Sequence, residues 1–397
     1  MAYNKALEVL RACVRDTGFY ASGLPGGYEA LWARDSMTTA LGASFRNEFK
    51  DTIKKSLDTL TANQSELGLI PNCVGSYNID RRSDVTFNAV DAPLWYIIGH
   101  YVYATRYKDT SLIAKHKNNI EQALHWLKCQ DSDNLRLLAQ QPTTDWQDAF
   151  PHKYGYTIHN NSLFYAVLHM VGEKQSAENL KKIINSEIKR YISLYDEKLG
   201  YYLPWGWKNH DGDREHEEWF DTLGNLLAIV TGLATPSIAK RILNYIAKQK
   251  INRPFPCKAI WPPMKKGDKN WHSYFEKCNA RDPYQYLNAG IWPMIGGFYV
   301  AALVKTKQHK KARKELENLA RANLQIIKEP GSPEYMEEIA MTKKIPKEKL
   351  KKIRQKEFNE WLDGRTGRPK GEPYQAWSAG AYLYAYGCLK RKKGLFF

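Results

Sequence analysis

The sequence of 397 residues lacks the patterns that send a chain to or across a membrane. Its N-terminus, Met1 to Lys5, has no basic stretch followed by an apolar one, as a secretory signal would have. No apolar run reaches the ~18 residues that a membrane-spanning helix needs. We therefore expect a cytoplasmic protein with no membrane partner.

Cysteine is scarce and forms no metal or disulfide pattern. The six cysteines are scattered without C-x-x-C spacing, at positions 13, 73, 129, 257, 278 and 388. Isolated cysteines of this kind are typical of reduced thiols in the cytoplasm. The polar stretch 210–216 lacks EF-hand spacing, and residues 23–27 do not join a strand to a helix as a phosphate-binding loop does. The sequence predicts neither a metal nor a cofactor.

Acidic residues are outnumbered by basic ones, which leaves a formal net charge of +17. The surplus is mostly lysine, in stretches that also fit surface helices, such as Lys181-Lys182, Lys310-Lys311 and Lys343 to Lys356. There is no arginine-rich arm and no RNA-binding signature. We interpret the charge as a solvated basic surface and expect no nucleic-acid partner. A helical scaffold that binds RNA or protein is the alternative from a different class.

Strand signals are nearly absent, whereas helical periodicity recurs about twelve times. We expect helices over residues 4–16, 33–46, 49–65, 88–107, 111–130, 160–173, 176–195, 219–231, 236–249, 288–306, 308–328 and 373–391. The odd-numbered members carry Lys and Glu on one face, so that one face meets solvent. The even-numbered members are apolar nearly all round, and we expect them to be buried on all sides.

Six exposed helices that alternate with six buried ones predict an all-α (α/α)6 barrel, with an inner ring of helices inside an outer ring. We expect a single catalytic domain over residues 1–397. A solenoid of stacked hairpins is the alternative, but the repeat spacing is irregular and no repeat consensus is present. The sequence does not indicate the oligomeric state.

Polar and aromatic motifs lie where connections enter the expected inner helices, and long connections usually carry function. These motifs contain Trp32, Arg34, Asp35, Asp91, Asp145, Trp146, Asp148, Glu218, Trp219, Asn288, Trp292, Glu360, Gln375 and Trp377. Because a barrel gathers the N-terminal ends of its inner helices around one mouth, we expect these side chains to form one site.

Two carboxylate segments in this set indicate cleavage of a glycosidic bond. Asp145-Trp146-Gln147-Asp148 and Glu360-Trp361-Leu362-Asp363-Gly364 each place carboxylates beside a tryptophan, whose ring suits the apolar face of a sugar. Such cleavage needs one protonated carboxyl group, which protonates the leaving oxygen, and one ionised carboxylate, which activates water or attacks the sugar. Asp363-Gly364 favours a turn.

At these residues the chain resembles the (α/α)6 glycoside hydrolases, specifically the amylo-α-1,6-glucosidase domain of glycogen-debranching enzymes and the alkaline/neutral invertases. The segments similar to the debranching enzymes are W-A-R-D at 32–35, G-L-I-P-N at 68–72, N-A-V-D-A-P-L-W at 88–95, T-T-D-W-Q-D-A at 143–149, E-W-L-D-G at 360–364 and Q-A-W-S at 375–378. Tyr154-Gly155, Phe220 to Leu226 and Asn288 to Pro293 are more similar to the invertases. Ala149 and Phe150 stand where the invertases have D-R-R.

The resemblance implies an exo-acting enzyme that hydrolyses α-glucosidic bonds with inversion. Asp148 would be the general acid and Glu360 the general base, with Asp145 a second candidate for the acid. The other residues of the set would bind the saccharide. A neutral invertase that hydrolyses sucrose is the alternative within this class. A terpene cyclase of α/α-toroid fold is disfavoured because no D-D-x-x-D or D-x-D-D motif is present.

Overall fold

The computed structural model describes residues 1–24, 27–75, 84–187, 192–208, 214–278, 282–325 and 357–397. The basic stretch 343–356, which we expected on a surface helix, lies outside the described residues. Most of the polar stretch 210–216 lies outside them as well.

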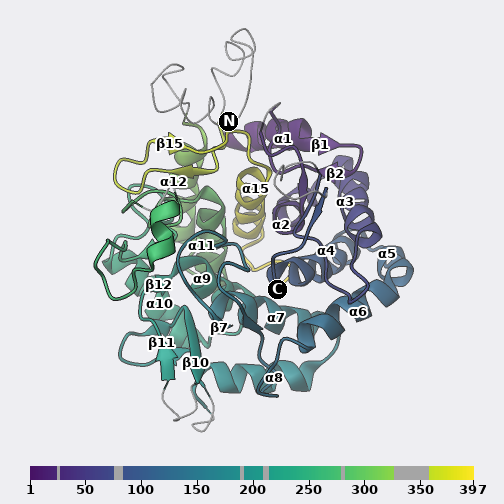
Figure 1. The fold of residues 1–397 in the computed structure, drawn as a ribbon. Helices are drawn as coiled ribbons and strands as arrows, with labels where there is room; N and C mark the ends of the chain where they lie inside the picture. Colours follow the sequence, from purple (N-terminus) through teal and green to yellow (C-terminus); the bar gives the residue numbers. More distant parts are fainter. Residues whose placement is uncertain (25–26, 76–83, 188–191, 209–213, 279–281, 326–356) are drawn as a thin grey trace.

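Six helices form a closed inner ring, as expected from the sequence. These helices are α2 (Ala33–Ala43), α4 (Asp91–Tyr107), α7 (Ile158–Met170), α9 (Thr222–Thr231), α11 (Pro293–Lys305) and α15 (Ala376–Arg391). Each packs against the next, and the last of them, α15, packs against the first, α2, so the ring is closed. In Figure 1 these helices surround the centre of the molecule.

The amphipathic helices form the outer ring. They are α1 (Ala2–Cys13), α3 (Lys50–Ala62), α5 (Ser111–Lys115), α6 (Lys117–Lys128), α8 (Lys174–Ile184), α10 (Pro236–Lys248) and α12 (His309–Asn323). The helix expected over residues 111–130 is divided at His116 into α5 and α6. Together with the inner ring, these helices confirm the (α/α)6 barrel. None of the described helices is long and apolar enough to cross a membrane.

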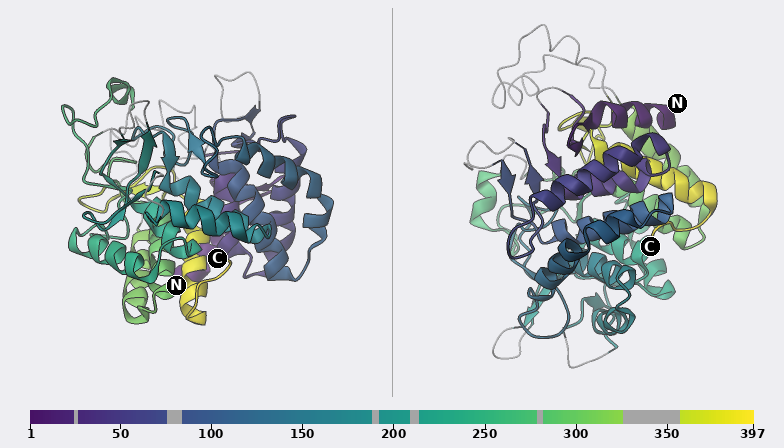
Figure 2. Two further views of the ribbon diagram at one scale, coloured as in Figure 1. Left: turned by 90° about the horizontal axis from the view of Figure 1, so that it is seen from below. Right: turned by 90° about the vertical axis from the view of Figure 1, so that its right-hand side faces the viewer.

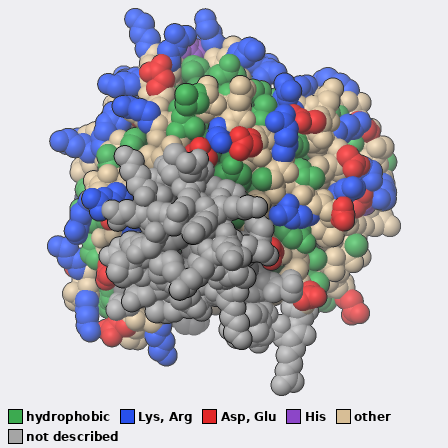
Figure 3. Space-filling view, turned by 90° about the horizontal axis from the view of Figure 1, so that it is seen from above, with side chains coloured by type: hydrophobic (Ala, Val, Ile, Leu, Met, Phe, Trp, Pro, Cys, Tyr) green, Lys and Arg blue, Asp and Glu red, His purple; other side chains and the backbone are tan. Residues whose placement is uncertain are grey.

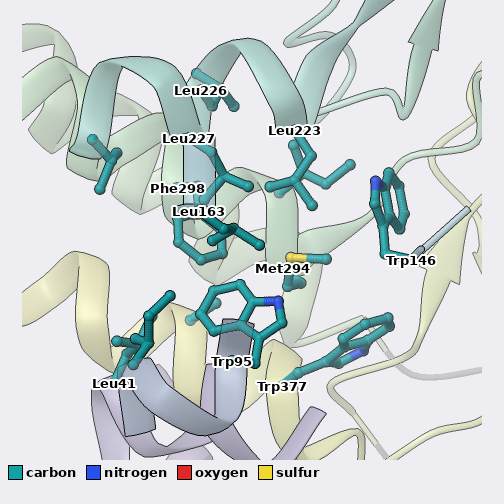
Figure 4. Close-up of a cluster of buried hydrophobic side chains, with 14 of the residues drawn as sticks. Leu41, Trp95, Trp146, Leu163, Leu223, Leu226, Leu227, Met294, Phe298 and Trp377 are labelled. Atoms are coloured by element: carbon teal, nitrogen blue, oxygen red, sulfur yellow. The ribbon is translucent and has the colours of Figure 1, made fainter. Parts of the chain in front are cut away.

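Apolar side chains from the inner helices fill the barrel below its mouth. Leu41, Trp95, Leu163, Leu223 and Phe298 are each at most 1% exposed and point toward one another in Figure 4. This filling explains why the inner helices are apolar all round, since one side meets the outer ring and the other meets the opposite inner helices. It also closes the barrel beneath the mouth.

Short strands are more frequent than the sequence indicated. They are β1 (Val14–Arg15), β2 (Gly18–Phe19), β3 (Leu31–Trp32), β4 (Cys73–Val74), β5 (Val85–Thr86), β6 (Ala139–Gln140), β7 (Gly155–Thr157), β8 (Tyr195–Asp196), β9 (Tyr201–Tyr202), β10 (Trp205–Lys208), β11 (Arg214–His216), β12 (Phe220–Asp221), β13 (Ile260–Trp261), β14 (Trp361–Leu362) and β15 (Pro369–Lys370). They pair in small antiparallel sheets of two to four strands. Most lie with the long loops at one end of the barrel (Figure 2).

Two inner helices, α9 and α11, begin later than expected. Asp221 ends β12, and its side chain accepts a hydrogen bond from the N–H of Gly224, so α9 begins at Thr222 instead of residue 219. Pro293 stands in the first turn of α11, where its fixed φ is compatible with a helix start. Asp221 and Pro293 therefore mark where these two helices begin.

Most of the described basic residues lie on the surface, as Figure 3 shows for one face, where acidic side chains are interspersed with them. Several lysines pair with carboxylates: Lys54 with Asp58 at 2.7 Å and Lys128 with Glu173 at 2.6 Å. Exposed pairs of this kind contribute little to stability.

Candidate active site

A cavity of about 330 Å³ opens at the end of the barrel where the inner helices begin. Its walls come from the first residues of α2 and α15 and from the segments that precede α2, α4, α7, α11 and α15. The lining residues are Ala21, Tyr28, Trp32, Arg34, Asp35, Asn72, Thr86, Asn88, Trp146, Asp148, Tyr286, Trp292, Glu360, Gln375 and Trp377. The volume is at the small end of the range for ligand pockets, about 300–1,000 Å³.

The structure brings nine of the predicted site residues to this cavity. They are Trp32, Arg34, Asp35, Trp146, Asp148, Trp292, Glu360, Gln375 and Trp377. The remaining five do not line it: Asp91, Asp145, Glu218, Trp219 and Asn288. The two carboxylate segments, far apart in the sequence, therefore meet at one mouth.

Arg34, in the first turn of α2, is the buried cation of the cavity wall. Its Nη1 donates to both carboxylate oxygens of Asp91, at 3.1 and 3.0 Å, and its Nη2 lies 4.0 Å from Oδ2 of Asp148. Burial raises the pKa of Asp91, but Arg34 and His159 lower it by more than burial raises it. The pKa of Asp91 therefore lies below its ordinary value. Asp91 thus lies behind Arg34 and holds it, while Arg34 lines the cavity.

Two aspartates beside Arg34 have raised pKa values. Burial raises the pKa of Asp35 to about 6, and burial raises the pKa of Asp148 to about 6, in both cases against the charge of Arg34. The charges of Asp145 and Asp91 act on Asp148 in the same direction as burial. The side chain of Asp148 is 39% exposed, and it lines the cavity. A carboxyl group with a raised pKa retains its proton nearer to neutrality.

Glu360 enters the cavity from the loop before α15. Its carboxylate accepts hydrogen bonds from the Tyr28 hydroxyl, at 3.2 and 3.3 Å, and from the N–H of Glu372, at 3.2 Å. Burial raises the pKa of Glu360 to about 8. Gly371 has φ +69°, and a Cβ there would lie 2.6 Å from Oε2 of Glu360. Only glycine therefore lets this loop approach the carboxylate so closely.

Three tryptophans form a continuous aromatic wall. The rings of Trp146 and Trp292 meet edge to face with centroids 5.6 Å apart, and those of Trp292 and Trp377 do so at 5.7 Å. Trp146 and Trp377 lie at the edge of the barrel core in Figure 4. Edge-to-face packing holds each ring in one orientation, so the wall is a rigid apolar surface next to the carboxylates.

Asp145 and Asp148 lie on opposite sides of their loop. Asp145 is fully buried, with Oδ2 2.7 Å from Nζ of Lys153, and its Oδ1 accepts from the N–H of Gln147 at 2.8 Å. Asp145 and Gln147 lie in the interior, whereas Trp146 and Asp148 line the cavity. The two candidates for the acid are therefore separated by position: only Asp148 reaches the cavity.

Three predicted binding residues, Glu218, Trp219 and Asn288, do not belong to the cavity wall. The Glu218 side chain is exposed, and its carbonyl accepts from the Tyr201 hydroxyl at 2.6 Å. Trp219 is buried and donates from Nε1 to Glu217. Asn288 is buried, and its amide group bonds both the N–H and the carbonyl of Met264, at 2.8 and 2.9 Å. Asn288 thus connects two loop segments that precede α11.

Sequence reasoning missed Tyr28, Thr86 and Lys153. Tyr28 and Thr86 line the cavity, but no local pattern distinguishes them from other loop residues. Tyr286 also lines it, as do Asn72 and Asn88, which belong to the segments 68–72 and 88–95 described above. Among the described residues, no group of three or more His, Cys, Asp or Glu side chains is placed to hold a metal ion.

Comparison with known families decides which proteins this arrangement belongs to. Residues 172–391, more than half of the chain, match the family described as alkaline and neutral invertase. The chain belongs to this family. Residues 13–191 match the amylo-alpha-1,6-glucosidase family. Both resemblances expected from the motifs are thereby confirmed, as is a place among the glycoside hydrolases.

Individual relatives are distant. The chain is 30% identical over 172 residues to probable alkaline/neutral invertase F of Arabidopsis thaliana. The match covers 42% of this chain and 28% of that protein. It is 23% identical over 348 residues to the mitochondrial neutral/alkaline invertase 1 of Oryza sativa subsp. japonica, covering 74% of this chain and 50% of that protein. The chain thus spans half or less of the length of these curated relatives.

Solved structures share the fold over nearly the whole chain. The GH63 mannosylglycerate hydrolase of Thermus thermophilus has a TM-score of 0.66 at 12% identity, covering 97% of this chain and 99% of that one. A rhamnosidase from Klebsiella oxytoca has a TM-score of 0.59 at 15% identity, covering 97% and 63%. Since the identities are low, these structures show the barrel fold alone.

Proposed function

We propose that the chain is an exo-acting glycoside hydrolase that cleaves α-glucosidic bonds of small saccharides with inversion. One observation carries this proposal: Asp148 and Glu360, from two distant loops, line the same cavity beside a wall of tryptophans. The small volume of the cavity and its closed floor favour a terminal sugar over the middle of a long chain.

In the proposed mechanism Asp148 protonates the leaving oxygen and Glu360 activates water. The Tyr28 hydroxyl and the N–H of Glu372 both donate to Glu360, and such donors stabilise the ionised form that a base requires. Arg34 and Asp35 would bind sugar hydroxyls, the arginine as donor and the aspartate as acceptor. Inversion requires room for a water molecule, so the two carboxyl groups should lie about 6.5–9.5 Å apart.

The two carboxyl groups together hold one proton near neutrality. Their pKa values, about 6 for Asp148 and about 8 for Glu360, give a singly protonated pair between these values. Acid–base catalysis needs this state. The higher pKa of Glu360 favours the opposite assignment, with Glu360 as acid and Asp148 as base, and this is the second candidate for the roles.

Variants at the two positions test the function. Asp148→Asn and Glu360→Gln should each lose on the order of 10²–10⁴-fold in kcat on an unactivated glycoside, the usual contribution of general acid–base catalysis. Circular dichroism should show both variants folded. Glu121→Gln is the matched control, because Glu121 lies on the exposed face of α6, and it should keep full activity. Full activity in Asp148→Asn or Glu360→Gln would exclude that residue from the mechanism.

The leaving group distinguishes the two assignments of roles. A glucosyl fluoride needs little protonation of its leaving group, so the variant that lacks the acid should retain much of its activity on this substrate. We expect this for Asp148→Asn and not for Glu360→Gln. The reverse result would assign the acid to Glu360.

The substrate is tested by a panel of sucrose, maltose, isomaltose and trehalose, with NMR resolution of the anomer released. Sucrose is included because the invertase family match covers residues 172–391, and its glucosyl bond is also α. Release of β-glucose from an α-glucoside supports inversion, whereas α-glucose would show retention. Salt-sensitive RNA binding with no hydrolysis of any saccharide would favour the basic scaffold instead.

A further inference from the structure

Lys153 is a fully buried lysine beneath the loop that carries Asp148. Its Nζ lies 2.7 Å from Oδ2 of Asp145 and 3.5 Å from Oδ2 of Asp221, and it donates to Oε1 of Gln147 at 2.7 Å. All four residues are 0% exposed. Burying an ammonium group is costly unless charged and polar partners replace water, so this cluster is a built arrangement and not a surface contact.

The cluster connects two parts of the barrel that are distant in sequence. Asp145 and Gln147 belong to the loop before α7. Asp221 is the N-cap of α9, where its Oδ1 accepts from the N–H of Gly224 at 3.1 Å. Since α7 and α9 pack against each other, Lys153 fastens the loop to the start of the next inner helix.

The alternation of side chains along the loop transmits this attachment to the cavity. Asp145 and Gln147 face Lys153, whereas Trp146 and Asp148 line the cavity. Asp148 therefore follows directly after a residue that Lys153 holds. Lys153 also compensates the charge of Asp145, and that charge is among those that raise the pKa of Asp148.

We propose that Lys153 is a positioning residue that holds the Asp148 loop against α9 and balances the charge of Asp145 behind it. This inference rests on the proposed role of Asp148 in hydrolysis. The other charged groups that act on Asp148 are Arg34 and Asp35, from α2, and Asp91, from α4.

Lys153→Met tests the proposal, because methionine keeps much of the apolar stem and removes the charge. We expect kcat to fall on the order of 10²-fold with KM changed less than about threefold, since a displacement of about 1 Å at a reacting group has this effect. The limb of the pH profile that reports Asp148 should move to higher pH, because an uncompensated Asp145 opposes ionisation of Asp148. Lys153→Arg should restore the limb.

Two further variants separate positioning from a general effect on folding. Lys153→Met combined with Asp145→Asn should return the limb toward the wild-type pH while kcat stays low. Lys305→Met is the matched control. Lys305 is the last residue of α11, at the end of this helix away from the cavity, where it is partly buried and donates to the carbonyls of Val230 and Phe397. It should lower the melting temperature and leave kcat and the pH profile unchanged.

A Lys153→Met enzyme with wild-type kcat and an unmoved limb would overturn the proposal. Should this variant fail to fold, Asp145→Asn carries the test alone and should move the limb to lower pH. If the wild-type protein hydrolyses no saccharide, the proposed function fails, and the ¹³C NMR titration of the Asp148 carboxyl, assigned with Asp148→Asn, still tests the positioning. Lys153→Met must then raise that pKa; an unchanged titration refutes the positioning role.

Discussion

Asp91→Asn removes one charge from the buried pair with Arg34 and preserves the size of the side chain. The two side chains are 0% and 6% exposed, and the pair has two contacts near 3 Å. Removing one partner of a buried pair costs about 3–5 kcal/mol, because the other charge remains buried without its partner. Asp148, 4.0 Å from Arg34, offsets part of this cost. We therefore expect the free energy of unfolding to fall by about 3 kcal/mol.

The assay is urea unfolding at pH 7, followed by circular dichroism and tryptophan fluorescence. Asp51→Asn is the matched control, because Asp51 also pairs with a cation, Lys55 at 3.2 Å, but is 71% exposed. Exposed pairs contribute less than about 1 kcal/mol. If Asp91→Asn lost no more stability than Asp51→Asn, the buried pair of Asp91 with Arg34 would contribute no more to stability than the exposed pair. In the activity that remains, the limb of the pH profile that reports Asp148 should lie at lower pH, because the charge of Asp91 no longer raises the pKa of Asp148.

Three further predictions concern Glu360 and its neighbours. The pKa of Glu360, about 8, is raised above the ordinary value of 4.5, so its contribution to stability is fully present below about pH 4.5 and is lost as pH rises through about 8. In calorimetry, Glu360→Gln should therefore melt at a higher temperature than wild type at pH 9 and close to it at pH 5. A lower melting temperature of the variant at pH 9 would contradict this. Tyr28→Phe removes a donor that lowers the pKa of Glu360, so the alkaline limb of kcat/KM should move to higher pH; an unmoved limb would show that the hydroxyl does not act on this group. Gly371→Ala places a methyl group 2.6 Å from the Glu360 carboxylate, at a backbone φ of +69°. It should reduce kcat and lower the free energy of unfolding by about 1 kcal/mol or more. The control is Gly172→Ala, also at positive φ but with nothing within 4 Å, which should lower stability and leave kcat unchanged.

The sequence predicted the helical rings because their periodicity depends on burial alone. Residues 223–230 are apolar at nearly every position, and the structure buries every one of them in α9. The strands were missed because pairs as short as Leu31–Trp32 and Cys73–Val74 have too few residues to show a period of two. Their existence depends on pairing between loops, which no local pattern encodes.

The candidate site was predictable where a residue stands at the start of an inner helix, as Arg34 and Gln375 do. The distinction between Asp145 and Asp148 was not, because it depends on which side of a loop each faces. Lys153 looked like any loop lysine; its burial depends on Asp221, which is distant in sequence and joins it only in the folded barrel. The position of Glu218 was not predictable either, because neighbouring loop residues can face opposite sides: Glu218 is exposed, whereas Glu217 and Trp219 are buried.

The closure of the ring between α15 and α2 has a consequence for synthesis of the chain. Tyr28, Arg34 and Asp148 leave the ribosome long before Glu360, Gln375 and Trp377, which complete the cavity. A nascent chain thus displays one carboxyl group of the proposed pair without the other. On the proposed mechanism, a translation product that lacks residues 357–391 is inert, and hydrolysis begins only when the last inner helix joins the first.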